Sequence, residues 1–298
     1  MYAKFDDLQK MVQSKKDARV AVASAQDKHS LEALRDLREQ FDMQYMLVGD
    51  GKEITRLSQD VGLDLSGVDI IEAQSEEEAA ADAVALVKKG EANLLMKGKL
   101  QTATLLKAVL NKETGIRHGT LMSHIAALES PAYDRLMYIT DGGINPAPDY
   151  SQKKGILLNA IGFLHKLGYE SPNVAALAAV EKASEKVPGT QDAFLLGKES
   201  ETGEILGCTV EGPISFDLAI SKVSAKIKGF ESKIAGETDI FLAPDISSGN
   251  ILAKALQYLG NAKMAGCVIG AKVPIILTSR GATAEEKYLS FLLALAAI

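Results

Sequence analysis

Pro274-Ile-Ile-Leu-Thr-Ser-Arg-Gly-Ala-Thr-Ala-Glu-Glu286 is the stretch of the chain that best indicates its fold. Residues 275–277 form a short apolar run with β-branched side chains, which predicts a buried strand. Ser279-Arg280-Gly281 then forms a polar turn. Thr283 is a favoured residue before a helix, and the two final glutamates would lie in the first helical turn, where carboxylates suit the positive end of the helix dipole. The stretch predicts a strand, a tight turn and a helix N-terminus.

The turn of this stretch is also a candidate anion site. In α/β proteins anions bind where a strand end meets the start of a helix, and a guanidinium there pairs well with phosphate. Arg280 would supply that group. The alternative is that Arg280 pairs with a nearby carboxylate and Gly281 serves the turn alone; the stretch by itself favours neither.

Size and composition indicate an ordinary globular protein with about two domains. The chain has 298 residues, of which 47% are hydrophobic and 24% charged. Its net charge of -6 offers no basic surface for nucleic acid, and 5% aromatic residues with no Trp argue against base stacking. Neither a nucleic acid nor a membrane is therefore an expected partner.

Cysteine usage and the N-terminus favour a cytoplasmic location. Cys208 and Cys267 are too few and too scattered for a disulfide framework or a zinc site. Residues 1–12 carry four charged side chains, unlike a signal peptide, and no apolar run reaches the length of a membrane span. The four histidines lack metal-ligand spacing, so no metal is predicted.

The first part of the chain alternates strands with helices. Strands are expected at 19–24, 45–48, 68–72 and 93–96, and helices at 5–12, 28–41, 54–61, 75–89 and 102–111. Ser75 and Glu78 are expected to form a capping box. This alternation predicts an α/β fold with a parallel, doubly wound sheet.

The alternation is interrupted and then resumes. Residues 119–127 and 135–140 form two strand-like runs with no room for a helix between them, which predicts an antiparallel pair. Helices are then expected at 151–167, 190–198, near 216 and at 248–259, with strands at 174–179, 208–210, 239–243 and 266–270. We expect a discontinuous first α/β domain of residues 1–118 plus 267–298 and a second of residues 119–266.

Four further loops follow predicted strands and carry polar groups. Lys97-Gly98-Lys99 could bind an anion, but a solvated pair of charges explains it equally well. For Asp141 with Asn145, an Asx-turn is a more probable interpretation than a functional acid. Glu211-Gly212-Pro213 is ambiguous, and ordinary capping by Ser247 or Ser248 explains the loop 245–250. The chain lacks the phosphate loop, the dinucleotide fingerprint and the nucleophile elbow.

Taken together, these loops resemble one family. Asp141-Gly-Gly-Ile-Asn-Pro-Ala-Pro-Asp149, Glu211-Gly-Pro-Ile-Ser-Phe-Asp217, Pro244-Asp-Ile-Ser-Ser-Gly-Asn250 and Ser279-Arg-Gly281 occur in the order and spacing of the phosphate acetyl/butyryltransferase family. The resemblance spans nearly the whole chain and is closer to the butyryltransferase branch. It implies the isocitrate/isopropylmalate dehydrogenase-like fold, with two α/β domains, an active-site cleft between them, and the C-terminal stretch returning to line it.

The resemblance implies reversible acyl transfer between coenzyme A and inorganic phosphate, without a resident cofactor. The catalytic group would comprise Ser279 as an oxyanion donor together with Asn145, Arg280 as a cation, and Glu286 as the base. The family's acetyltransferases have an aspartate at the position of Glu286, so Glu285 stays open as the base. Phosphate, coenzyme A and the acyl group are expected at Lys97, Lys99, Thr102, Asp141, Asn145, Asn250 and Gly281.

A second departure from the acetyltransferases concerns acyl length. Their substrate-binding arginine on the helix after Lys97-Gly98-Lys99 is replaced here by Lys107, Ala108 or Val109. A roomier, more apolar pocket would favour butyryl over acetyl. The alternatives are a phosphate acetyltransferase, a β-decarboxylating dehydrogenase-like enzyme and a small-molecule binding protein. The resemblance also implies a homo-oligomer, a dimer or larger.

Overall fold

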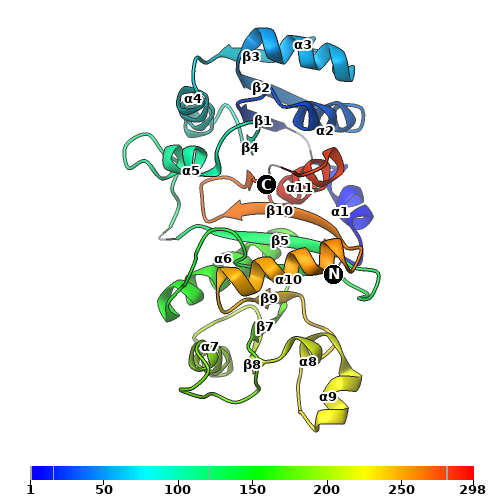
Figure 1. Cartoon of the computed structure of the whole chain (residues 1–298), viewed down its shortest axis with the longest axis vertical. Helices are drawn as coiled ribbons and strands as arrows, with labels where there is room; N and C mark the ends of the chain where they lie inside the picture. Colours follow the sequence, from blue (N-terminus) through cyan, green and yellow to red (C-terminus); the bar gives the residue numbers. More distant parts are fainter. Residues whose placement is uncertain (1, 16, 120, 280) are drawn as a thin grey trace. The chain divides into compact units, whose positions relative to one another are not determined.

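The computed structural model describes residues 2–15, 17–119, 121–279 and 281–298 and divides the chain into two compact units. Unit 1 comprises Met1–Phe5 and Leu121–Met264, and unit 2 comprises Asp6–Thr120 and Ala265–Ile298. In Figure 1, unit 2 holds the blue-to-cyan elements and the red helix, whereas most of unit 1 runs from green to orange. The domain boundaries expected from the sequence stay a prediction.

Unit 2 contains the predicted parallel sheet. Its strands are β1 (Ala18–Ala23), β2 (Met43–Gly49), β3 (Asp69–Glu72), β4 (Leu94–Lys97) and β11 (Ile275–Ile276), together with most of β10 (Lys263–Ile269). They lie in the order β3-β2-β1-β4-β11-β10. All neighbouring pairs are parallel except β10 with β11, which is antiparallel. The strand-and-helix alternation of the sequence therefore does form a mainly parallel sheet.

The helices of unit 2 are α2 (Lys28–Arg38), α3 (Gly51–Val61), α4 (Glu76–Lys89), α5 (Thr102–Leu110) and α11 (Ala284–Ala296); α1 (Phe5–Val12) starts at the boundary of the units. All residues of α11 from Leu289 to Ala296 are buried, which fits a helix that is apolar on every face. Although far apart in sequence, α11 and α2 pack side by side (Figure 1).

Unit 1 contains the other five strands of the eleven-stranded sheet. Its strands are β5 (Ser123–Glu129), β6 (Met137–Thr140), β7 (Asn173–Leu177), β8 (Thr209–Ile214) and β9 (Ile240–Leu242), in the order β5-β6-β9-β7-β8. The expected antiparallel pair is β5 with β6, and the other neighbours are parallel. Ile139, Phe241 and Ile214 are among the buried residues of its core.

The helices of unit 1 are α6 (Tyr150–Lys166), α7 (Thr190–Thr202), α8 (Phe216–Ile220), α9 (Lys222–Lys228) and α10 (Ile246–Tyr258). The sequence analysis missed α9. This helix has seven residues, three of them lysines, and it buries Ala225 but leaves Val223 and Ile227 exposed. So short a segment gives little periodic pattern from which a helix could be predicted.

Two predicted caps differ from the structure. Ser75 does accept from the N–H of Glu78, but the Glu78 carboxylate accepts from the N–H of Gln74, so the predicted capping box is only half formed. The helix expected at 54–61 begins at Gly51, because the Asp50 side chain accepts from two N–H groups of its first turn. No helix in the described ranges is long and apolar enough to cross a bilayer.

Candidate functional site

Three strands of unit 2 end side by side. Ala23 of β1 pairs with Lys97 of β4, and Met96 pairs with Ile276 of β11. The carboxyl ends of parallel strands share one edge of a sheet, so Lys97-Gly98-Lys99 and the turn at 279–281 come together there. Gly98 is required for this approach, since a Cβ on it would lie 2.2 Å from the Ser24 carbonyl oxygen.

The two lysines of this edge differ in environment. Lys97 is 4% exposed, and its Nζ donates to the carbonyls of Gly98 and Leu100, each at 3.2 Å. Lys99 is exposed, and its backbone N–H donates to the Ser24 carbonyl. The Lys97 ammonium is thus buried and held by carbonyl groups, whereas the Lys99 side chain is open to solvent.

Two buried hydroxyl groups at the same edge are unsatisfied. Within the described part of the chain, Ser24 Oγ and Thr278 Oγ1 have no hydrogen-bond partner, and the two residues are 1% and 9% exposed. Each follows the end of a strand that pairs with β4. A buried polar atom without a partner costs about 1–3 kcal/mol and often marks a functional site. The sequence analysis missed both hydroxyls.

The turn after β11 has the predicted form. Ser279 and Gly281 are exposed, and Ser279 Oγ accepts from the Gly281 N–H at 3.5 Å. The carbonyl of Ser279 accepts from the Ala282 N–H at 3.2 Å. Arg280, the predicted cation of this turn, lies outside the described residues.

The predicted N-cap of α11 is confirmed and involves the predicted base. Thr283 Oγ1 accepts from the N–H of Glu286 at 3.2 Å, while Glu286 Oε2 accepts from the N–H of Thr283 at 2.7 Å. These reciprocal bonds form a capping box that fixes the Glu286 side chain at the helix start. Glu285 is exposed in the same turn.

A pocket of about 380 Å³ lies between α4 and α5 in the same unit. Ala81 and Val84 line it from α4, and Ala103, Lys107 and Ala108 line it from α5. It starts near Thr102, the predicted substrate-binding residue that opens α5. Val109, the third residue considered for acyl length, is fully buried and does not line it.

In unit 1 the loop after β6 is organised by Asp141. Its carboxylate accepts from the N–H groups of Gly143, Ile144 and Asn145 and from Asn145 Nδ2, over 2.6 to 3.2 Å. The Asx-turn interpretation is therefore confirmed. Asn145 Nδ2 also donates to the Met122 carbonyl at 2.9 Å, so both of its amide hydrogens are already bonded. As an oxyanion donor, Asn145 would have to break one of these bonds.

The start of α10 packs on this loop. Asn250 Nδ2 donates to the Gly142 carbonyl at 3.0 Å, and a Cβ on Gly249 would lie 2.9 Å from the Asp141 carbonyl oxygen. The residues 245–250, expected as a loop, are the N-cap and first turn of α10. Asp245, rather than Ser247 or Ser248, caps the helix by accepting from the Ser248 N–H at 2.8 Å. The loop 141–145 and the first turn of α10 thus contact each other at the ends of β6 and β9.

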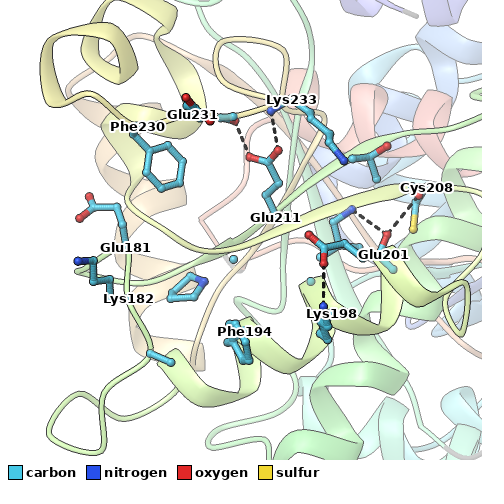
Figure 2. A pocket seen from close by; sticks show the side chains of 18 residues that line it. Glu181, Lys182, Phe194, Lys198, Glu201, Cys208, Glu211, Phe230, Glu231 and Lys233 are labelled. Carbon is cyan, nitrogen blue, oxygen red and sulfur yellow. Dashed lines mark hydrogen bonds and ion pairs between the residues drawn. The ribbon is translucent and has the colours of Figure 1, made fainter.

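The Glu211 motif borders a larger pocket, of about 950 Å³, between α7, β8 and the loop 230–233 (Figure 2). Glu211 Oε1 accepts from the Lys233 N–H at 2.6 Å, and Glu211 also binds the Ser232 hydroxyl. Asp217 pairs with Lys228 at 3.0 Å. Both acidic groups therefore contact neighbouring segments, and residues 211–213, expected as a turn, belong to β8.

No group of three or more His, Cys, Asp or Glu side chains among the described residues is arranged to hold a metal ion. The imidazole of His124 lies against Gly143, and burial lowers the pKa of His124 while the nearby Asp141 carboxylate opposes that shift. His124 thus packs against the Asp141 loop.

Comparisons with known proteins agree with these motifs. The sequence profile described as "Phosphate acetyl/butaryl transferase" matches residues 77–296. The chain is 41% identical to the phosphate butyryltransferase of Clostridium acetobutylicum, over 99% of this chain and 98% of that protein.

Two solved structures resemble the fold of this chain. A branched-chain phosphotransacylase from Enterococcus faecalis V583 is 31% identical with a TM-score of 0.83, over 94% of this chain and 98% of that one. A putative 4-hydroxythreonine-4-phosphate dehydrogenase from Salmonella typhimurium shares the fold alone, with 13% identity and a TM-score of 0.56 over 96% of this chain and 100% of that one. The chain belongs to the phosphate acetyl/butyryl transferase family, because the profile matches residues 77–296 and the 41% identity extends over nearly the whole chain.

Proposed function

We propose that the protein transfers a short-chain acyl group, butyryl in particular, between coenzyme A and inorganic phosphate, giving an acyl phosphate and coenzyme A. The 41% sequence identity to a phosphate butyryltransferase, over 99% of this chain, supports this reaction. The structural observation that carries the proposal is the edge of the unit 2 sheet, where the buried Lys97 ammonium lies beside the two unpartnered hydroxyls and the turn that leads into α11.

The phosphate site would use Lys97 as its main cation, with Lys99 and Thr102 at the adjacent helix start. A dianion is stabilised by ammonium groups and by the N–H groups of helix N-termini. Arg280 keeps the phosphate-binding role predicted from the sequence. When the enzyme holds phosphate against the thioester carbonyl, the two reactants no longer have to meet by diffusion. This positioning is expected to supply a large part of the rate enhancement.

The chemical step is direct transfer. A phosphate oxygen attacks the thioester carbonyl, the C–S bond breaks, and the acyl group ends on phosphate while the thiolate takes up a proton. The Ser279 hydroxyl and the Gly281 N–H are the proposed donors to the developing oxyanion. Glu286 is proposed to carry the thiol proton, with Glu285 as the alternative.

The unit 1 residues Asp141, Asn145 and Asn250 are proposed to bind substrate through the shape of their loops. The Asn145 side chain already donates to the Asp141 carboxylate and to the Met122 carbonyl, and the Asn250 side chain donates to the Gly142 carbonyl. We therefore assign substrate contacts here to backbone groups of these loops and assign oxyanion donation to the turn at 279–281.

The pocket between α4 and α5 is proposed to receive the acyl chain. Three alanines and Val84 supply apolar surface to this pocket, and Glu77, Thr104, Lys107, Asn111 and Thr114 complete its lining. A butyryl chain exceeds acetyl by two methylenes, and each methylene that leaves water contributes about 0.8 kcal/mol. An apolar pocket of this kind favours butyryl.

Further expectations stay proposals. We propose the isocitrate/isopropylmalate dehydrogenase-like fold that the motif resemblance implies, with the two units as its domains. The catalytic cleft between domains, the homo-oligomer and the cytoplasmic location stay predictions from the sequence.

Thiol release from acetyl-, propionyl-, butyryl- and valeryl-CoA, each with and without phosphate, tests the proposed reaction. We expect phosphate-dependent release with the highest kcat/KM for butyryl-CoA. A maximum at acetyl-CoA would identify a phosphate acetyltransferase instead. Thiol release at the same rate with and without phosphate would indicate a thioesterase. No thiol release would favour a dehydrogenase-like enzyme or a binding protein.

A further inference from the structure

A buried ion pair joins two helix starts in unit 2. Lys287 Nζ lies 2.8 Å from Asp27 Oδ2, and the Lys287 side chain is 5% exposed. Asp27 is also the N-cap of α2, because its Oδ2 accepts from the Ser30 N–H at 3.0 Å. The Ser30 hydroxyl completes the cluster by donating to Asp27 and lying 3.0 Å from Lys287 Nζ. One carboxylate oxygen therefore serves both helices.

The position of this pair matters more than its strength. Lys287 directly follows Glu286, and its backbone N–H donates to the Thr283 carbonyl within the first turn of α11. Asp27 lies in the loop after β1, the strand that pairs with β4 beside Lys97. The pair thus connects the turn that holds the proposed base to the sheet edge that holds the proposed phosphate site.

The capping box and the ion pair act on different parts of the first turn of α11. The capping box between Thr283 and Glu286 fixes the base relative to its own helix. The Lys287 side chain reaches the loop after β1 through Asp27 and the loop's continuation into α2 through Ser30.

A separate tie runs to β10, because Ser290 Oγ donates to the Glu286 carbonyl and accepts from the Gly266 N–H. Lys287 therefore adds the tie to the strand end that lies beside Lys97.

We infer that the Asp27–Lys287 ion pair is a positioning element of the transferase, which holds the first turn of α11 so that Glu286 faces the reacting groups. This inference rests on the proposed function. The pair acts through Glu286 and touches no substrate. Phosphate binding by Lys97 and Lys99 depends on other elements, so loss of the pair should lower kcat while leaving the KM for phosphate nearly unchanged.

Lys287→Met, Asp27→Asn and the double variant test the pair. For each single variant we expect kcat per folded molecule to fall about 10- to 100-fold, with KM for phosphate and butyryl-CoA within about three-fold of wild type. Lys287→Arg, which retains the charge and the reach, should restore most of the rate. The double variant should regain thermal stability over Lys287→Met, because no unpaired charge stays buried, yet it should not regain kcat.

Arg135→Met is the matched control. It breaks another buried pair, Arg135 with Asp239 at 3.5 Å, at the amino ends of β6 and β9. We expect it to lower stability without changing kcat per folded molecule. Equal kcat in Lys287→Met and wild type, or recovery of kcat together with stability in the double variant, would overturn the positioning role.

Hydrogen–deuterium exchange separates this inference from the proposed function. Peptides covering residues 284–290 should exchange faster in Lys287→Met than in wild type and should be unchanged in Arg135→Met. Unchanged exchange in Lys287→Met would show that the pair does not anchor α11. The wild-type thiol-release assay judges the reaction independently, whatever the exchange data show.

Discussion

Glu286 and Thr283 hold each other at the start of α11, since each accepts a hydrogen bond from the backbone N–H of the other, at 2.7 and 3.2 Å. The proposed base is therefore also part of a helix cap. The two roles differ in chemistry, because capping needs an acceptor oxygen at this position whereas proton transfer needs an ionisable carboxyl group. Substitutions can separate them.

Glu286→Gln should abolish proton transfer but keep the cap, because glutamine serves a capping box as well as glutamate. We expect kcat to fall about 10²- to 10⁴-fold with little change in Tm. Steady-state kinetics and thermal unfolding followed by circular dichroism measure the two effects. Glu286→Ala should lose both. Glu285→Gln is the matched control, and a larger loss of kcat there than in Glu286→Gln would move the base to Glu285.

Thr283→Ala should destabilise the protein through the loss of the N-cap. We expect a decrease of about 0.5–2 kcal/mol in the free energy of unfolding, measured by urea denaturation. Thr283→Ser keeps the hydroxyl and should stay close to wild type. Equal stability of the alanine and serine variants would show that the hydroxyl contributes nothing to the cap.

Lys97→Met should weaken phosphate use, because it removes the buried ammonium at the end of β4 while keeping an unbranched side chain. We expect kcat/KM for phosphate to fall about 10- to 100-fold. Lys99→Met, at an exposed position, should lose less because exposed charges are screened by solvent. The phosphate dependence of thiol release measures both. A greater loss in Lys99→Met would transfer the main phosphate contact to Lys99.

Ala108→Phe should fill the pocket between α4 and α5 and change acyl preference. The ratio of kcat/KM for butyryl-CoA to that for acetyl-CoA should fall about ten-fold or more, since pocket contacts with one methylene distinguish substrates by about 1–3 kcal/mol. Leu110→Phe on the exposed side of the same helix is a control that leaves the pocket open. An unchanged ratio in Ala108→Phe would place the acyl chain elsewhere.

Acid should weaken the Asp27–Lys287 link. Burial raises the pKa of the Asp27 carboxyl, but the Lys287 ammonium and hydrogen bonds from Lys287 and Ser30 outweigh it and bring the pKa below its ordinary value of 3.8. Because the folded pKa lies below the unfolded one, the stabilisation is complete above the unfolded pKa and is lost as the pH falls through the folded pKa.

Asp27→Asn should remove this contribution to acid sensitivity. Wild type is expected to lose more free energy of unfolding than Asp27→Asn when the pH falls from about 5 to about 2, with urea denaturation as the measurement. Parallel pH profiles for the two proteins would show that the ionisation of Asp27 does not contribute to stability.

Much of the fold follows from local sequence patterns. The apolar run before Thr278 and the cap at Thr283 predicted β11 and α11, and the antiparallel run at 135–140 predicted β6. These features depend on neighbouring residues, which the sequence displays directly. Helix α9 escaped prediction because its seven residues are too few to display a helical pattern.

The candidate site was only partly predictable. Motif order by itself indicated the family, which the profile match and the sequence identity show. The roles of the loops around Lys97, Asp141 and Ser279 stay predictions. Only the tertiary structure decided that Asn145 is already bonded to Met122 and Asp141, and that Lys287 reaches Asp27 across 260 positions of sequence. A hydrogen bond or ion pair between distant residues depends on how the strands are ordered in the sheet, and neither residue type nor local spacing encodes that order.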